Sequence, residues 1–334
     1  MIPKRIKELS SAAYTSFTFL AGMKLDVFTV LSEKQLSPKQ LAKIMNVKEN
    51  HIERLLYALF SVGLLRKENG EFMNTVEAEQ YLVKGRPDYL GNHVYVNPGL
   101  NYMNWGAGVY IADSIKKGEP HDFYDFQAAS YDEHLETFRG TMPVAVKAGE
   151  ELAKWFDFSD VKTVVDVGGS SGGLAIALKK AYPHLSLRVD DLPSIVPVSK
   201  TILRENSAFD IEVKVCDIVK GPLTKPCDVA ILRAVIQVVS PEDASIGIRN
   251  VADSINSGGY LMILGHVLDD SKISPIEEVG MNLIYLNWGY ESGCYTRSQY
   301  SEWIKGAGLV DIDFDSLPNG DRVITARKLG KINR

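Results

Sequence analysis

The chain has 334 residues, of which 45% are hydrophobic and 24% charged, and its formal net charge is −5. This length exceeds the size at which one hydrophobic core usually stops growing, so we expect two domains. The average composition excludes a disordered, collagen-like or disulfide-scaffold protein, and the small acidic excess gives no general reason to expect a nucleic-acid or membrane partner.

The cysteines and the N-terminus indicate the compartment. Cys216, Cys227 and Cys294 are too few for a disulfide framework, and no Cys-x-x-Cys pair suggests structural zinc. The first residues carry charges where a signal peptide needs an apolar core, and no apolar run reaches the roughly 18 residues of a membrane span. We therefore expect a soluble, cytoplasmic protein without a metal site.

Residues 1–100 read as a winged-helix dimerisation domain. Apolar residues at helical spacing over 10–32 predict a buried helix pair. Ser37 followed by Pro38 marks the start of a helix, and a second helix is expected near 50–62. The pair Asn69-Gly70 is typical of a two-residue hairpin turn, which supplies the wing.

A winged helix raises the question of DNA binding. Its second helix mixes both charge signs around Lys48 and Arg54, where a helix that reads the groove would present several basic residues. We therefore expect this domain to pack in a homodimer rather than on nucleic acid. Residues 101–150, with a helix over 131–148, are expected to form a helical bridge.

Residues 151–334 predict an α/β fold of the doubly wound, Rossmann-like type. Short apolar runs alternate with helix-length segments, which indicates a mostly parallel sheet whose ligand lies at the carboxyl ends of the first strands. The expected strands are 163–167, 185–189, 211–215, 229–232 and 260–264.

Acidic residues mark three successive strand ends. Asp166 precedes a glycine-rich loop of residues 168–173, Asp191 follows the second expected strand, and Asp217 follows the third. The loop is neither the Gly-x-Gly-x-x-Gly dinucleotide pattern nor a Walker loop with its lysine. Each acid alone could be a helix N-cap, but together they indicate an adenosyl ligand.

These motifs resemble those of the class I S-adenosylmethionine-dependent O-methyltransferases. The resemblance rests on the loop 164–173, Asp191-Leu192-Pro193, Cys216-Asp217-Ile218, residues 231–243 and Ser257-Gly258-Gly259. More narrowly, the chain is similar to the plant caffeate and acetylserotonin type and to its bacterial relatives that act on phenols and secondary metabolites. The resemblance covers nearly the whole chain, because that family also carries an N-terminal winged-helix dimerisation domain.

The resemblance implies S-adenosyl-L-methionine as the cofactor and assigns roles by position. Gly168 and its loop would hold its methionine part, Asp191 its ribose, and Asp217 with Ile218 its adenine, with Arg233 beside the cofactor. Phe138 and Met142 match a Phe-x-x-x-Met motif that packs around cofactor and acceptor. The implied cofactor residues are Asp166, Gly168, Gly169, Ser170, Asp191, Leu192, Asp217, Ile218 and Arg233.

The sequence departs from the family at the positions of its chemistry. Ser170 stands where the loop usually has glycine, and Gln237 replaces the histidine that removes the acceptor's proton. The two carboxylates that orient this histidine fall at Gly265, next to His266, and near Cys294. The usual base is therefore absent, and we expect Gln237 to position the acceptor.

Methyl transfer can proceed without that base, because the sulfonium supplies the electrophile and alignment supplies much of the rate. The acceptor is then expected to ionise readily or to be a neutral nucleophile. His266, His93 and His134 are alternative bases, although a structural or surface role is the simpler expectation for each. Acceptor contacts are expected from Met281, Tyr285 and Trp288, on one helix face, and from Cys294.

The sequence thus predicts a homodimeric methyltransferase that acts on a small aromatic metabolite, and the resemblance implies that the methyl group goes to an oxygen. Two alternatives stay open: an enzyme of this fold with non-methylating chemistry, and a winged-helix DNA-binding regulator.

Overall fold

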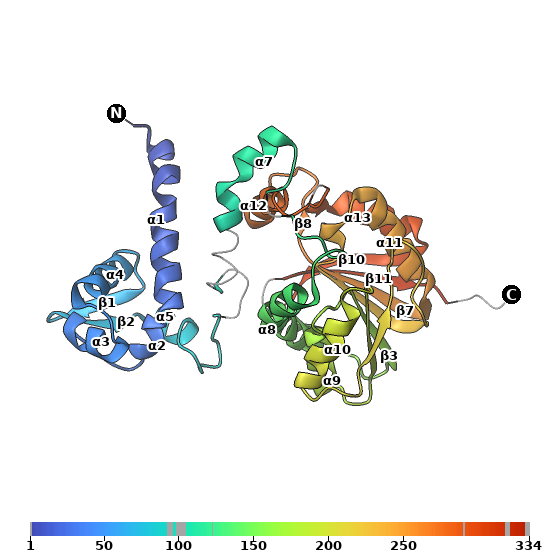
Figure 1. Ribbon diagram of the computed structural model, residues 1–334, viewed down its shortest axis with the longest axis horizontal. Coiled ribbons are helices and arrows are strands. Elements are labelled where there is room, and N and C mark those ends of the chain that lie inside the picture. Colours follow the sequence, from blue (N-terminus) through green and yellow to red (C-terminus); the bar gives the residue numbers. More distant parts are fainter. Residues whose placement is uncertain are drawn as a thin grey trace. The chain divides into compact units, whose positions relative to one another are not determined.

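The structure is a computed structural model that describes residues 2–91, 96–97, 105–121, 123–289, 291–317 and 321–330. The chain divides into two compact units, residues 1–106 and 107–334, and each is described by itself (Figure 1). Among the described residues, no helix combines the length and apolar character that crossing a membrane would require.

The first unit is a helical domain with one hairpin. Ser37 caps the third helix with a capping box that includes Gln40, as the Ser-Pro pair predicts. The hairpin turns at Asn69-Gly70, where both residues have positive φ angles and Glu68 pairs with Glu71, so this prediction is confirmed. Its elements are α1 (Lys4–Lys24), α2 (Val27–Val30), α3 (Pro38–Met45), α4 (Glu49–Ser61), β1 (Leu65–Glu68), β2 (Glu71–Asn74) and α5 (Val76–Tyr81).

The predicted helix pair is present as α1 and α2, but its burial is uneven. The end of α1 packs into the core of this unit through Met23, together with Phe28 of α2, and Leu20 is also buried. Farther toward the N-terminus, Leu9 and Tyr14 are exposed within this chain. The sequence predicted an apolar segment, and the structure buries its C-terminal end while Leu9 and Tyr14 stay exposed within this chain.

The second unit is built on a seven-stranded sheet in the order β10-β11-β7-β6-β3-β4-β5. The strands from β5 to β7 are parallel, and β11 and β10 close the edge in antiparallel pairing. The strands are β3 (Thr163–Val167), β4 (Ser186–Asp191), β5 (Glu212–Val215), β6 (Cys227–Arg233), β7 (Ile255–Leu264), β10 (Leu309–Ser316) and β11 (Arg322–Lys328). The predicted doubly wound sheet is confirmed, and the order in which strands are added reverses between β3 and β6, which lie side by side and parallel.

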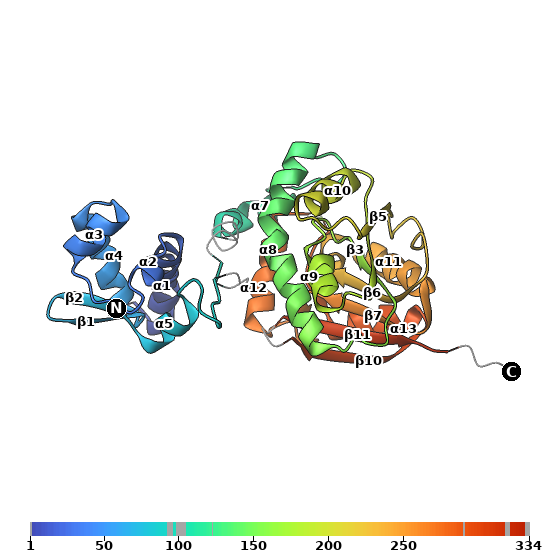
Figure 2. The ribbon, with the colours of Figure 1, turned by 90° about the horizontal axis from the view of Figure 1, so that it is seen from below.

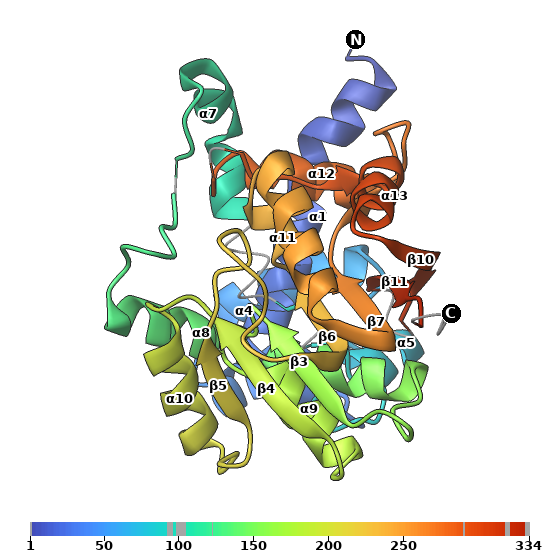
Figure 3. The ribbon, with the colours of Figure 1, turned by 90° about the vertical axis from the view of Figure 1, so that its right-hand side faces the viewer.

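Alternate residues of the central strands face two separate cores. Val164 and Ile231 belong to the core beneath α8 (Tyr131–Trp155) and α9 (Gly173–Ala181), whereas Val165 and Leu232 belong to the opposite core. Figure 2 shows α8, α9 and α10 gathered on one side of the sheet, and Figure 3 shows α11 beside α13. The remaining helices that cover the sheet are α10 (Val196–Glu205), α11 (Pro241–Asp253) and α13 (Arg297–Gly306).

The segment 107–150 lies in the second compact unit and not in a body of its own. The long helix α8 reaches from Tyr131 to Trp155 and packs closely along α9. A Cβ at Gly149 would lie 2.7 Å from the Leu174 carbonyl oxygen, and one at Gly173 would lie 3.0 Å from the Met142 carbonyl oxygen. This close helix contact explains why the segment assigned to a bridge joins the sheet domain.

A short insertion follows β7. The strands β8 (Val267–Leu268) and β9 (Tyr295–Thr296) pair in parallel, and α12 (Ile276–Tyr285) lies between them in the chain. A further short helix, α7 (Ile111–Lys117), contacts this insertion: Ser114 donates a hydrogen bond of 2.6 Å to Asn287, whose side chain is fully buried. The insertion brings α12 to the carboxyl ends of β6 and β7.

Candidate active site

The glycine-rich loop after β3 is shaped by contacts that side chains would block. Gly168 has a φ of 66° and Ser170 has a φ of 43°, which is the left-handed region. A Cβ at Gly169 would lie 2.4 Å from Cγ of Asp166, so only glycine fits above this carboxylate. The loop therefore exposes main chain at the end of β3, and Ser170 adopts the backbone that a glycine would favour.

Asp166, at the end of β3, is a buried carboxylate. Its side chain is 1% exposed, and neither oxygen has a donor among the described residues. Burial raises its pKa to about 7, against the opposing effect of the Arg233 charge. A buried polar group of this kind is costly unless something else satisfies it.

Asp191, at the end of β4, ties the loop to the neighbouring strand. Its carboxylate accepts hydrogen bonds from the main-chain N–H groups of Ser170, at 2.8 Å, and of Leu192, at 2.7 Å. Burial nevertheless raises its pKa to about 6. Each oxygen keeps a second lone pair, so the carboxylate can still accept hydroxyl groups.

The third acid lies beside the second, as the sequence predicts. The N–H of Cys216 donates to the Asp191 carbonyl oxygen at 2.7 Å, which brings Asp217 next to the end of β4. Asp217 pairs with Lys220 at 2.8 Å and accepts the N–H of Val219. Ile218 is buried, and its carbonyl oxygen accepts a hydrogen bond from Asn250.

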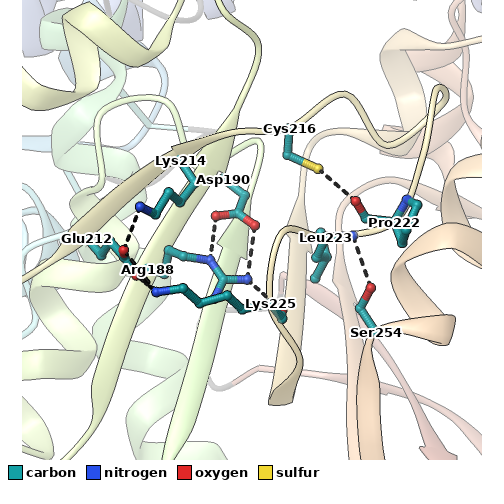
Figure 4. A network of polar contacts seen from close by, with 9 residues as sticks. All are labelled: Arg188, Asp190, Glu212, Lys214, Cys216, Pro222, Leu223, Lys225 and Ser254. Carbon is teal, nitrogen blue, oxygen red and sulfur yellow. Dashed lines mark hydrogen bonds and ion pairs between the residues drawn. The ribbon is translucent and has the colours of Figure 1, made fainter.

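A buried ion pair stiffens the strands that carry these acids (Figure 4). Arg188 and Asp190, both on β4, are joined by hydrogen bonds of 2.6 and 3.1 Å. Arg188 also donates to the carbonyl oxygen of Lys225, and Lys225 pairs with Glu212 on β5. The network links β4, β5 and the segment before β6, and its member Asp190 directly precedes Asp191 in the chain.

Arg233, the last residue of β6, lies within electrostatic reach of Asp166. Burial lowers the pKa of its guanidinium group, while the negative charges of Asp166 and Asp321 oppose that shift. Arginine keeps its proton under such conditions. A cation and a buried carboxylate therefore lie within electrostatic reach of each other near the point where the strand order reverses.

The three departures from the family's base occur together in space. Gln237, on a short 3₁₀ turn after β6, is fully buried, and neither its amide nitrogen nor its amide oxygen has a hydrogen-bond partner among the described residues. A Cβ at Gly265 would lie 1.7 Å from this nitrogen, so the missing side chain at Gly265 makes room for the glutamine. The N–H of Gly293, next to Cys294, donates to the Gln237 carbonyl oxygen at 2.9 Å.

His266 follows Gly265 and is held by a carboxylate from the insertion. Its Nδ1 lies 2.5 Å from an oxygen of Glu278, in the first turn of α12. The two side chains are 19% and 7% exposed. The ring of His266 also meets the edge of the Tyr285 ring, with centroids 5.9 Å apart.

The predicted acceptor residues on and after α12 form one cluster. Tyr285 and Cys294 are buried together, and Met281 and Trp288 pack against them. Burial raises the pKa values of the Tyr285 hydroxyl and the Cys294 thiol well above their usual ranges, so both stay protonated. Tyr285 also lies within the electrostatic reach of Arg233, which connects this cluster to β6.

Phe138 and Met142 lie on α8 and pack with Leu192, the neighbour of Asp191. They are therefore close to the second strand end. Of the alternative bases, His134 is fully buried on α8 and its Nδ1 contacts the Tyr124 hydroxyl at 2.7 Å. His93 lies outside the described residues.

Two residues of this site, Glu278 and Asn282, were not predicted from the sequence. The side chain of Asn282 accepts the N–H of Cys294 at 2.8 Å. Glu278 shares a helix face with Met281 and Tyr285, at spacings of three and seven residues. A charged residue on an otherwise apolar face was the signal that pointed to it.

The fold and the site together define a methyltransferase of the Rossmann-like class. Residues 114–310 match the family model for the O-methyltransferase domain, and residues 7–84 match the O-methyltransferase dimerisation domain. Because the first match spans more than half of the chain, the protein belongs to the O-methyltransferase family. It is an S-adenosylmethionine-dependent methyltransferase.

Relatives and solved structures agree with this assignment. The chain is 25% identical over 314 residues to the 3-hydroxy-5-methyl-1-naphthoate 3-O-methyltransferase of Streptomyces sahachiroi, covering 93% of this chain and 90% of that protein. It is 23% identical over 339 residues to the N,N-dimethyltransferase OxyT of Streptomyces rimosus, covering 97% and 96%. The fold matches the human N-acetylserotonin methyltransferase in complex with SAM, with a TM-score of 0.75, 22% identity and 98% and 97% coverage.

Proposed function

We propose that the protein transfers the methyl group of S-adenosylmethionine to an oxygen of a small aromatic metabolite. The observation that carries this proposal is the buried amide of Gln237, which has no partner among the described residues and lies beside Gly265 at the ends of β6 and β7. Relatives with oxygen acceptors on fused aromatic rings, such as the naphthoate 3-O-methyltransferase, support the acceptor class.

The cofactor fits the chemistry of the strand ends. The orphaned oxygens of Asp166 suit a cationic ligand, and Arg233 suits a carboxylate, so the pair would hold the methionine end. Asp191 and Leu192 would hold the ribose, and Asp217 with Ile218 the adenine. The loop Gly168, Gly169 and Ser170 would let main chain approach closely. When bound, the cofactor supplies a methyl group on a positively charged sulfur as the electrophile.

Gln237 would act by alignment and not as a base. Its amide oxygen can accept a hydrogen bond from the acceptor hydroxyl, and its amide N–H can donate one to a neighbouring oxygen. The amide cannot take a proton at neutral pH. Holding two reactants in line contributes a large share of the rate of a displacement. The acceptor would be enclosed by apolar and aromatic side chains: Phe138, Met142, Met281, Tyr285, Trp288 and Cys294.

The first unit would join two chains into a homodimer. Residues 7–84 match a dimerisation domain, and α1 exposes Leu9, Tyr14 and Phe17 within this chain. A row of large apolar side chains in water is unfavourable and is typical of a contact surface. Light scattering at micromolar concentration should show a mass about twice the 37.0 kDa of one chain, and a clean monomer would contradict the proposal.

Calorimetry and a methyl-transfer assay test the function together. Asp191→Ala should weaken S-adenosylmethionine binding at least about tenfold, because charged hydrogen bonds contribute roughly 1.5–3 kcal/mol. Asp210→Ala, at a surface ion pair with Lys179, is the control. Unchanged affinity in Asp191→Ala would overturn the cofactor assignment, and transfer to amines but not to any phenol would overturn the acceptor assignment.

A further inference from the structure

Within the part of the chain that the structure describes, one contact between a histidine and a carboxylate at the strand ends has no role in the proposed function. This contact joins His266 to Glu278. Nδ1 of His266 lies 2.5 Å from Oε2 of Glu278, and the two side chains are 19% and 7% exposed. They come from different elements, the end of β7 and the first turn of α12. The neighbouring residue, Gly265, contacts Gln237.

The carboxylate determines which nitrogen of the ring is basic. Glu278 accepts the Nδ1–H hydrogen bond, so the neutral ring carries its free lone pair on Nε2. The negative charge of Glu278 also stabilises the ring once it is protonated. The edge of the Tyr285 ring packs against His266 and limits its rotation.

The other titratable groups around this pair do not serve as proton acceptors. Burial keeps Tyr285 and Cys294 protonated, because it raises both pKa values. Arg233 is a cation, and the Gln237 amide is not a base. His266 is therefore the side chain of this cluster that can serve as a general base.

We propose that His266 is a relocated catalytic base that removes the proton of the acceptor hydroxyl, and that Glu278 is its positioning residue. The inference rests on the proposed function, and it adds where the proton goes. The O–H bond breaks toward Nε2, the electron pair of the oxygen forms the bond to the methyl carbon, and the pair of the broken C–S bond remains on sulfur. The imidazolium, paired with Glu278, later returns its proton to water.

This base would widen the acceptor class. Without a base, the enzyme would act on acceptors that are already ionised in solution. With His266, it would also act on phenols of ordinary acidity, since general-base help contributes about 10²–10⁴-fold in rate. A purely structural pair that ties α12 to β7 would affect all acceptors equally, which makes the two roles separable.

The first experiment compares transfer to phenol and to 4-nitrophenol, an acidic phenol that is largely ionised at mildly alkaline pH. His266→Gln should lower kcat/KM for phenol by about 10²–10⁴-fold and for 4-nitrophenol by less than about tenfold. Glu278→Gln should lower the rate for phenol by about 10–100-fold. His184→Ala, a histidine bonded to the Phe158 and Val161 carbonyls, is the control, and circular dichroism checks that each variant is folded.

The second experiment needs no methyl transfer. Calorimetry in buffers of different ionisation enthalpy measures the protons taken up when 4-nitrophenolate binds to the cofactor-free wild type at mildly alkaline pH. Uptake of about one proton per chain in the wild type, lost in His266→Gln, supports the base.

The outcomes separate the two levels of the proposal. Equal losses for both phenols in His266→Gln, or unchanged proton uptake, would overturn the base while the proposed function stands. A wild type that methylates neither phenol would contradict the proposed function, and the base would fall with it.

Discussion

The two halves of the proposed site are built in different ways. The ends of β3, β4 and β5, proposed for the cofactor, present acids and main chain that follow directly from each strand. The ends of β6 and β7, proposed for the acceptor, are completed by side chains from a turn, an insertion and a distant loop: Gln237, His266, Glu278, Tyr285 and Cys294. The cofactor half is determined by the fold, because its residues directly follow the strands. The acceptor half is assembled from separate segments, so its chemistry can change while the fold remains.

The largest expected effect tests how far the first half depends on its support. Arg188→Ala leaves Asp190, which is 1% exposed, as an unpaired buried charge. Removing one member of a buried pair costs about 3–5 kcal/mol. Urea unfolding should show this loss of stability, together with weaker S-adenosylmethionine binding.

The double variant Arg188→Met/Asp190→Leu is the control, since apolar residues of similar volume can replace a buried pair at little cost. If Arg188→Ala unfolds at the same urea concentration as the wild type, the strand ends of the first half do not depend on this network.

The second half is tested by Gly265→Ala. The added Cβ would overlap the Gln237 amide, and overpacking of a buried site costs about 1–3 kcal/mol. Activity should fall more than stability, because the Gln237 side chain can avoid the added methyl group only by leaving its position beside residue 265. Gly280→Ala, on α12 with open space around its Cβ, should be neutral or stabilising by up to about 1 kcal/mol. Equal activity of Gly265→Ala and the wild type would show that the position of Gln237 is unimportant.

The third prediction concerns pH and Asp166. Its folded pKa of about 7 exceeds its ordinary value of 3.8, so its folded state binds the proton more tightly. The stability that it contributes is therefore lost as pH rises from about 4 to about 7. A cationic ligand favours the ionised form, so S-adenosylmethionine affinity should rise by up to about tenfold between roughly pH 6 and 8.

Calorimetry across this range measures the effect, and Asp166→Asn should flatten it. Asp191, with a pKa of about 6, adds a smaller change at the acidic end. A flat profile in the wild type would exclude ionised Asp166 from binding the cofactor.

The smallest effect is expected at Ser170. Ser170→Gly relieves a left-handed backbone, which costs about 1 kcal/mol for a residue with a side chain, but it also increases the entropy of the unfolded chain. The net change in unfolding free energy should stay within about 0.5 kcal/mol. Gly172→Ala, where a Cβ would lie 2.6 Å from Leu203, should be clearly destabilising in the same thermal-unfolding measurement. A large gain from Ser170→Gly would show that the loop is strained.

The sequence predicted the elements whose signals are local. The capping box at Ser37, the turn at Asn69-Gly70 and the three acids at strand ends all follow from neighbouring residues. The packing of residues 107–150 against the sheet domain does not follow from neighbouring residues, because the contact of α8 with α9 depends on glycines far apart in the chain. The pairing of His266 with Glu278 and the fit of Gln237 against Gly265 likewise require tertiary structure.

The parallel pairing of β8 with β9 has a consequence for how such enzymes diversify. Because Val267 pairs with Tyr295, the two ends of the insertion that contains α12 lie next to each other. Segments with adjacent ends tolerate replacement, since the cost of closing a loop grows only slowly with its length. Residues 269–294 could therefore be exchanged between relatives as one segment. Such an exchange would replace Glu278, Tyr285 and Cys294 together and leave the sheet unaltered.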